Sequence, residues 1–386
     1  MNGQDMPRRW VIGLYGSAIF LFWISLYLYV PTLSVYIQER TGELAVVGTI
    51  LSMFGLWQAI IRLPLGILSD WGGRRKPFII GGLAFSLLGA LLLGTSSRFA
   101  GLLAGRALTG IAAGAWVPLV VAFSALFPRR EAVRATSLLL VLNSSGRMLA
   151  TGANGWLNSM GGYQLAFAAA AGAAALSLLF LLPAPERRTQ PKPPHLSRIA
   201  HLAGRREVLL PSLVSAVAQF SAWTSVFTFT PILARRLGAS DGVLSAMMSL
   251  NIAMVVIGGL VVTILVKRSG PKPLLYLAFI LIAVGISAAG LAHNLTMIII
   301  SQIANGLAAG LSHSILMGLS IERVNEEERS TAMGLHQSIF ALGVFTGPWL
   351  SGLLADAIGL RPMFAVVAAA TLLTGVLGTR WLKVEG

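Results

Sequence analysis

The 386-residue chain contains no cysteine, which excludes disulfide bonds, thiolate nucleophiles and metal sites with cysteine ligands. Charged residues are also scarce, because Asp, Glu, Lys and Arg make up only 11% of the chain, against about 25% in ordinary soluble domains. So few charges cannot cover the surface of a water-soluble fold. The sequence therefore excludes a soluble globular protein.

Motifs of catalysis are missing as well. The chain has no Gly-x-x-x-x-Gly-Lys-(Ser/Thr) phosphate loop, no metal-ligand spacing and no nucleophile elbow. We therefore expect neither an enzyme nor a protein that holds a cofactor or a metal.

Long apolar runs are what the chain does have, and 55% of its residues are hydrophobic. A helix needs about 20 such residues to cross about 30 Å of hydrocarbon. We predict an all-α membrane protein with twelve spans near residues 10–34, 45–68, 78–96, 99–126, 135–157, 163–182, 208–234, 243–266, 273–292, 295–321, 331–355 and 362–382.

The basic residues are distributed unevenly, which explains the net charge of +15 without nucleic acid. With the N-terminus inside, 21 of the 29 Lys and Arg residues fall in cytoplasmic segments, and only Arg40, Arg98, Arg235, Arg236 and Arg361 fall outside. This is the positive-inside pattern. It predicts a multi-pass protein of the inner or plasma membrane with both termini in the cytoplasm, and it argues against a nucleic-acid partner.

The two halves of the chain resemble each other. Thr109–Gly114 (Thr-Gly-Ile-Ala-Ala-Gly) recurs as Asn305–Gly310 (Asn-Gly-Leu-Ala-Ala-Gly), and Pro31 corresponds to Pro231 at nearly the same offset. Ordered matches at corresponding helix ends favour duplication in one orientation. We expect an N-terminal half (residues 1–182), a proline-rich and basic cytoplasmic linker (183–207) and a C-terminal half (208–386).

The loop after the second predicted span carries the most specific motif. Residues 66–76 read Gly-Ile-Leu-Ser-Asp-Trp-Gly-Gly-Arg-Arg-Lys and include Gly66, Asp70, Gly73, Arg74 and Arg75. This stretch resembles the signature loop of the major facilitator superfamily, Gly-x-Leu-(Ala/Ser)-Asp-Arg-x-Gly-Arg-(Arg/Lys). It departs at Trp71, where the family usually has Arg, so one cation of the loop is absent.

The resemblance covers the whole chain and implies two pseudo-symmetric six-helix halves that rock around a midplane site. It also implies that Asp70 latches the halves against the start of the eleventh span in one state and releases in the other. Asp70 at a helix C-terminus does need a compensating group, because it faces an unfavourable dipole. The alternative is a loop that only forms a turn and sets topology.

Arg106 in the fourth span precedes Gly110 and Gly114, which resembles a second family motif. A membrane-embedded arginine costs several kcal/mol unless it faces a cavity or a partner. The family analogy assigns Arg106 to substrate binding or proton coupling, and the alternative is a side chain that snorkels to the interface.

Arg147 lies about thirteen residues past Arg134, near the bilayer midplane. Asn143, Arg147 and Thr151 follow at helical spacing and Asn154 comes three residues later, so they form one polar stripe. The stripe favours either contact with a substrate or structural pairing with polar neighbours.

The helix-five motif of proton-driven drug exporters in this family is degenerate, because Gly152-Ala153-Asn154-Gly155 lacks its proline. The eleventh span keeps Gly343, Gly347 and Pro348. Small residues at this spacing permit close helix packing, and we expect that role for Gly110, Gly114, Gly347 and Pro348.

None of the 14 acidic residues falls in the middle of a predicted span. The titratable candidates within spans are His313 and His336, of which His336, beside Gln337, could change charge near neutral pH. The alternative is an ordinary satisfied polar residue.

In the seventh span, Gln219 and Trp223 share a face that the family resemblance places on the central cavity, with ordinary packing as the alternative. Arg62, about two helical turns before Asp70, could snorkel to the cytoplasmic surface.

These features favour a carrier, proton-linked or exchanging, of a small anionic or polar organic solute, working as a monomer in the lipid bilayer. A multidrug or sugar-type efflux antiporter is the first alternative. A receptor or lipid-handling protein that moves no solute is the second.

Overall fold

The computed structural model describes residues 6–186, 196–325 and 328–382, and these residues are almost entirely helical. The N-terminal half comprises α1 (Arg8–Tyr27), α2 (Val30–Thr41), α3 (Leu44–Trp71), α4 (Lys76–Thr95), α5 (Phe99–Gly114), α6 (Trp116–Ser124), the short turn η1 (Arg129–Glu131) and α7 (Ala132–Leu181). The C-terminal half comprises α8 (Leu196–Gly204), α9 (Arg206–Thr224), η2 (Ser225–Phe229), α10 (Thr230–Arg236), α11 (Asp241–Ser269), α12 (Pro271–Gly290), α13 (Leu295–Glu322), α14 (Arg329–Ile358) and α15 (Leu360–Trp381).

Within the described residues, eleven helical segments are long and apolar enough to cross a membrane. One of them, α7, has 50 residues and consists of two helices joined at Gly161 and Gly162. Gly162 has φ 68°, a left-handed conformation that residues with a side chain seldom adopt. The break turns one helical segment into two spans, so the predicted twelve crossings are confirmed.

The first and seventh spans are interrupted at corresponding places. The first breaks at Leu28 and Tyr29 before α2, and the seventh passes through the π-helical turn η2 before α10. Pro31 and Pro231 stand in the first turns of α2 and α10, where proline is tolerated because those N–H groups have no intrahelical partner. The repeated prolines therefore mark repeated breaks.

Part of the expected linker, residues 183–207, is helical. Residues 187–195 lie outside the described part of the chain, but α8 follows them and packs Leu202 against Val208, Val324 and Leu335 of the C-terminal half. At the other end of the segment, Glu186 accepts hydrogen bonds from the backbone N–H groups of Arg75 and Lys76 at the start of α4. Each end of the segment is therefore attached to its own half.

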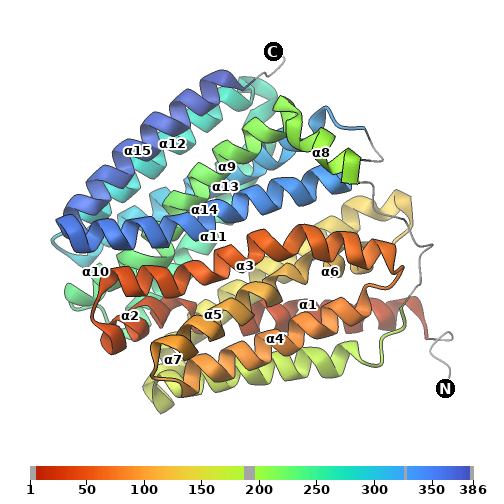
Figure 1. Ribbon diagram of the computed structural model, residues 1–386, viewed down its shortest axis with the longest axis horizontal. Coiled ribbons are helices and arrows are strands. Elements are labelled where there is room, and N and C mark those ends of the chain that lie inside the picture. Colours follow the sequence, from red (N-terminus) through yellow and green to blue (C-terminus); the bar gives the residue numbers. More distant parts are fainter. Residues whose placement is uncertain (1–5, 187–195, 326–327, 383–386) are drawn as a thin grey trace.

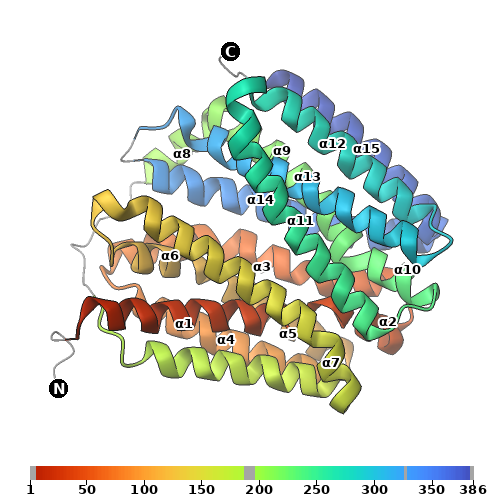
Figure 2. The same cartoon turned by 180° about the vertical axis from the view of Figure 1, so that it is seen from behind.

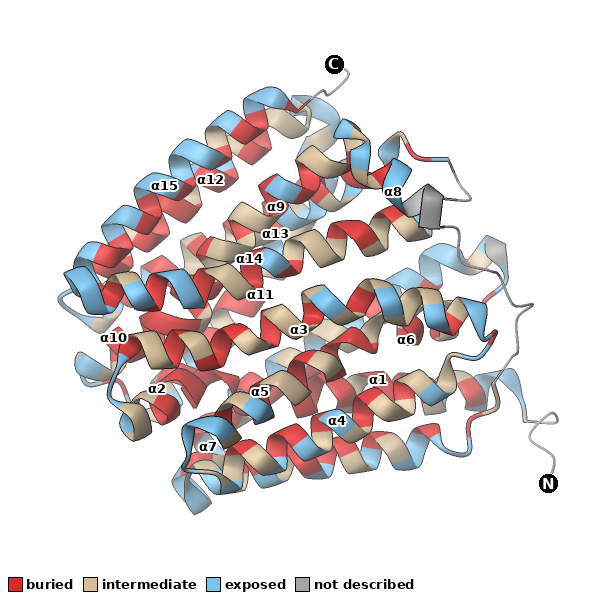
Figure 3. Ribbon diagram, in the orientation of Figure 1, coloured by how far each residue is buried: buried red, intermediate tan, exposed pale blue. Residues whose placement is uncertain are grey.

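The helices form two bundles whose ribbons run together around α2 and α10 and diverge toward α8 (Figure 1, Figure 2). Buried residues concentrate on the helix faces between the bundles, whereas the outer faces of α4, α12 and α15 are largely exposed (Figure 3). An exposed apolar outer face is what a lipid-facing helix requires. We call the end that carries α8 the Asp70 end and the opposite end the Asp356 end.

Candidate substrate site

Arg106 is buried between α5 and α3, with only 2% of its surface exposed. Its guanidinium carbon lies 4.3 Å from the centroid of the Phe54 ring, and Nη1 is 3.5 Å from Thr109 Oγ1. Tyr29 lies beside it, with its hydroxyl turned toward Arg106 and Thr109. Arg106 is therefore held mainly by an aromatic face, and it does not snorkel.

Glycine allows this placement of Arg106. A Cβ on Gly110 would lie 2.7 Å from the Phe54 carbonyl oxygen and 3.0 Å from its Cα, so only glycine lets α5 approach α3 this closely. On the same face, a Cβ on Gly114 would collide with the side chain of Ile61. The small-residue motif therefore brings the Phe54 ring under the guanidinium, and the packing role expected for both glycines agrees with these contacts.

Arg147 projects from α7 toward α1, half-buried. Its guanidinium carbon lies 4.3 Å from the Tyr27 ring and 5.8 Å from the Trp23 ring. In the described chain its Nε, the Asn143 Oδ1 and the Trp23 Nε1 are all buried without a hydrogen-bond partner. Buried polar atoms of this kind are costly, and here they gather at one place.

The polar stripe on α7 divides into two parts. Toward the Asp356 end, Thr151 bonds Ser249 at 2.8 Å, and Asn154 Oδ1 accepts from Thr32 at 3.0 Å and from Ser245 at 3.3 Å. This part pairs with α2 and α11. Asn143 Oδ1 and Arg147 Nε, near the middle, have no hydrogen-bond partner in the described chain. Structural pairing therefore accounts for Thr151 and Asn154 but not for Asn143 and Arg147.

An aromatic stack crosses from one half to the other. Phe54 and Trp223 have ring centroids 5.2 Å apart at 28°, and Trp223 and Phe227 are 4.6 Å apart at 23°. Gln219, one helical turn before Trp223, is half-buried. Trp223 therefore joins the two halves by stacking on Phe54, the ring that lies beneath Arg106. The sequence analysis missed Phe54.

One further basic side chain, Arg62, joins this region. Arg62 is only 7% exposed, which corrects the expectation that it snorkels; its guanidinium lies over the Phe340 ring of α14 at 5.6 Å. Tyr27 lies within electrostatic range of both Arg62 and Arg106. The helical pattern of α3 alone could not show that α14 covers this position.

His336 and Gln337 occupy the first turns of α14. His336 is fully buried, with Nδ1 3.0 Å from Ser212 Oγ of α9 and Nε2 unpartnered among the described residues. Gln337 is half-buried, and its Oε1 also lacks a partner there. His336 thus packs within the C-terminal half, whereas His313 of α13 is exposed.

The signature loop is closed on itself. Arg75 Nη2 donates to Asp70 Oδ1 at 2.7 Å, and Arg74 lies 3.9 Å from Glu186. Gly73 has φ 60°, which explains a glycine at this turn. Gly66 lies in α3 one turn before Asp70, near Val117. In this conformation Asp70 pairs within its own loop and, among the residues that the structure describes, with none at the start of α14.

The packing motif of α14 lies toward the opposite end. Gly347 approaches the Phe220 backbone so closely that a Cβ would collide with it, and the Pro348 carbonyl occupies the space beside Gly48 of α3. These residues therefore join α14 to α9 and α3, in agreement with the packing role expected from sequence.

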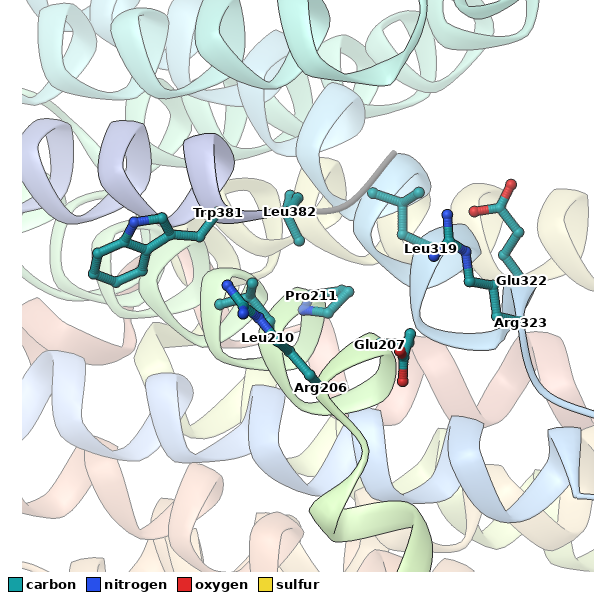
Figure 4. Close-up of a pocket in the computed structure, with 9 residues that line it drawn as sticks. All are labelled: Arg206, Glu207, Leu210, Pro211, Leu319, Glu322, Arg323, Trp381 and Leu382. Carbon is teal, nitrogen blue, oxygen red and sulfur yellow. The ribbon is translucent and has the colours of Figure 1, made fainter. Parts of the chain in front are cut away.

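A surface pocket at the Asp70 end is separate from these residues (Figure 4). It is lined at the ends of α9, α13 and α15 by Arg206, Glu207, Leu210, Pro211, Leu319, Glu322, Arg323, Trp381 and Leu382. Its position at helix ends places it at the edge of the membrane region. Among the described residues, no group of three or more His, Asp or Glu side chains could hold a metal ion.

Comparison with known proteins agrees with this architecture. A family model described as Major Facilitator Superfamily matches residues 15–288 and 212–386. The inner membrane transport protein YajR of Escherichia coli is 36% identical over 28% of this chain and 25% of its own length. A chloramphenicol efflux pump of Mycobacterium tuberculosis is 24% identical over 95% of this chain and 89% of its own.

Solved structures share the fold at low sequence identity. The nucleoside transporter NupG superposes with a TM-score of 0.76 at 15% identity and covers 98% of this chain and 100% of its own. A POT family transporter bound to 5-aminolevulinic acid gives 0.80 at 11% identity, covering 97% and 96%. With twelve spans, the signature loop and a family match along nearly the whole chain, this protein belongs to the major facilitator superfamily of membrane transporters.

Proposed function

We propose that the protein is a secondary carrier of a small anionic organic solute, which it moves by alternating access between the two halves. The observation that carries this proposal is that Arg106 and Arg147 lie between the helices near the middle of the spans without a carboxylate partner in the described chain. A buried charge that nothing neutralises is strongly destabilising. A bound anion would supply the missing charge.

The aromatic surroundings support an organic solute. Tyr27 and Trp23 flank Arg147, and Phe54 lies beneath Arg106. Ligand sites usually combine apolar walls with a few polar groups that fix orientation. The carrier would therefore hold the acidic group at a guanidinium and the carbon skeleton against the rings.

Transport would be proton-linked or would exchange one solute for another. No acidic residue of the described part of the chain contacts Arg106 or Arg147, so a carboxylate-based proton step has no support there. His313 and His336 are the titratable candidates. Positive-inside placement of Lys and Arg supports an orientation with the Asp70 end and both termini in the cytoplasm. The membrane would then be the inner or plasma membrane.

Replacing Arg147 by Leu tests the proposal. We expect the purified variant to remain folded by size-exclusion chromatography but to lose anion-induced thermal stabilisation and vesicle uptake by more than about tenfold, because one charge-assisted contact is removed. Arg147→Lys, which keeps the charge, should retain part of both. Unchanged uptake by Arg147→Leu would refute the role of this residue.

A second candidate is multidrug efflux, favoured by the similarity to a chloramphenicol efflux pump along 95% of the chain. The missing proline after Gly152 and the lack of a membrane-embedded acid weigh against it. A thermal-shift screen at two pH values separates the candidates. Stabilisation by lipophilic cations or neutral drugs, with none by anions, would favour efflux.

A further inference from the structure

Arg62 is a third buried guanidinium that the proposed site does not yet use. It is 7% exposed, its Nε has no hydrogen-bond partner in the described chain, and its guanidinium lies 5.6 Å from the centroid of the Phe340 ring. A cation–π contact offsets only part of the cost of burying a guanidinium, and a buried charge without a charged partner is strongly destabilising. Arg62 thus needs an anion that the described chain does not supply.

His313 lies across from Arg62 on the other half. Its ring centroid is 5.8 Å from that of Phe340, the same ring that Arg62 covers. The charges of Arg147 and Arg62, both in the N-terminal half, act on His313. The exposed surface of His313 therefore faces the space between the halves and not lipid.

Helix geometry puts these two side chains at one depth. Arg62 precedes Asp70 by eight residues and His313 precedes Glu322 by nine. At 1.5 Å per residue, both lie about 12 to 14 Å from the Asp70 end. His336, the other titratable group near His313, is turned toward Ser212.

The number of buried positive charges bears on the number of acidic groups that the substrate carries. Arg62, Arg106 and Arg147 carry three positive charges around Tyr27 and Phe340, and a monoanion would neutralise one of them. A second acidic group on the same solute would lie against Arg62, with the His313 ring as a further hydrogen-bond donor.

The geometry points to a second anion subsite formed by Arg62 and His313, so that the preferred solute carries two acidic groups. This inference rests on the proposed function, because the first acidic group is the one held at Arg147 and Arg106. The spacing of the two subsites would select the length of the solute.

The test uses the purified full-length protein and matched carboxylic acids. Thermal-shift titration compares α,ω-dicarboxylates, from succinate to suberate, with the monocarboxylates of equal chain length. We expect one or more dicarboxylates to bind at least about tenfold more tightly than the matched monoacid, since one charge-assisted hydrogen bond contributes about 1.5 to 3 kcal/mol. Arg62→Gln should remove this preference, and Arg62→Lys should restore part of it.

Arg268→Gln is the matched control, because it removes an arginine that is exposed at the end of α11, and it should keep the preference. Equal binding of monoacids and diacids, or a preference that survives in folded Arg62→Gln, would overturn the second subsite. If monoacid binding still depends on Arg147 in that case, the proposed function stands without a second subsite. Absence of binding by every acid of the series, at any length, would count against both proposals.

Discussion

The two ends of the α3–α14 pair differ in how they hold the halves together. At the Asp356 end, Asp356 of α14 accepts hydrogen bonds from the backbone N–H groups of Leu44 at 3.1 Å and Ala45 at 2.8 Å, the first residues of α3. At the Asp70 end, the corresponding acid of α3 pairs with Arg75 of its own loop. One acid joins the halves, and the other does not.

Further contacts strengthen the Asp356 end. Asn158 of α7 donates to Asp241 of α11 at 2.7 Å, and a Cβ on Gly155 would lie 2.6 Å from Gly242. The charged groups described at the Asp70 end pair within one half, as Arg8 does with Glu131. The structure is therefore closed between the halves at the Asp356 end.

The comparison suggests how the two acids act in turn. Asp356 lies in the last turn of α14 and caps the start of α3. The dipole of α14 disfavours a negative charge at this place, and the dipole of α3 favours it, so the two effects offset each other. Asp70 stands in the mirrored position at the other end of the same helix pair. We expect that Asp70 takes the equivalent contact with α14 when the Asp356 end opens.

The largest loss of transport is expected from a bulky side chain placed between α3 and α14 at the Asp356 end. Gly48→Val puts a side chain into the space held by the Pro348 carbonyl, and overpacking of this kind costs about 1 to 3 kcal/mol. Vesicle transport should fall by about tenfold or more. Gly81→Val is the control, since nothing lies within 4 Å of a Cβ at that position; equal loss in both variants would contradict the expectation.

Removing the charge of the capping acid should have a smaller effect. Asp356→Asn weakens the cap of α3 and should raise the population opened at this end by about threefold to fivefold. The chain has no cysteine, so Ser245→Cys, buried beside Asn154, reports opening through its rate of maleimide labelling. Glu43→Gln, an acid at the same helix start whose side chain makes no cap bond, should leave that rate unchanged.

The same labelling should respond to Asp70→Asn with the opposite sign. Asp70 stabilises the alternative state in this scheme, so its loss should slow labelling of Ser245→Cys by about twofold and slow transport. Faster labelling would show that Asp70 and Asp356 do not stabilise opposite states. Asp70 would then only form part of the turn between α3 and α4.

The smallest effect concerns Glu131, which holds the start of α1 at the Asp70 end through Arg8. The hydrogen bond from Arg8 lowers the pKa of Glu131 below its ordinary value of 4.5. Its contribution to stability is thus present above that ordinary value and is lost as the pH falls through the lowered pKa. Glu131→Gln should melt slightly below the parent protein at neutral pH and equally at strongly acidic pH; a difference that persists in acid would exclude this linkage.

Sequence reasoning recovered the crossings and the family, because both depend on patterns local to one helix or loop. It also located Arg106 and Arg147, since an arginine inside an apolar run is visible in any sequence. It missed the burial of Arg62 and the connecting role of Phe54, because their partners Phe340 and Trp223 lie in the other half. It favoured His336 over His313, although the charges of Arg147 and Arg62 act on His313.

By itself, the sequence determined that this chain spans a membrane, since its hydrophobicity and its scarcity of charge leave no soluble alternative. It also led us to expect a positive interior, because Arg106 and Arg147 fall within predicted spans that hold no acid near their middle. Only the tertiary structure decided which end is closed and which arginines share one region. Both depend on contacts between residues far apart in the chain, such as Asp356 with Leu44, which helical periodicity does not encode.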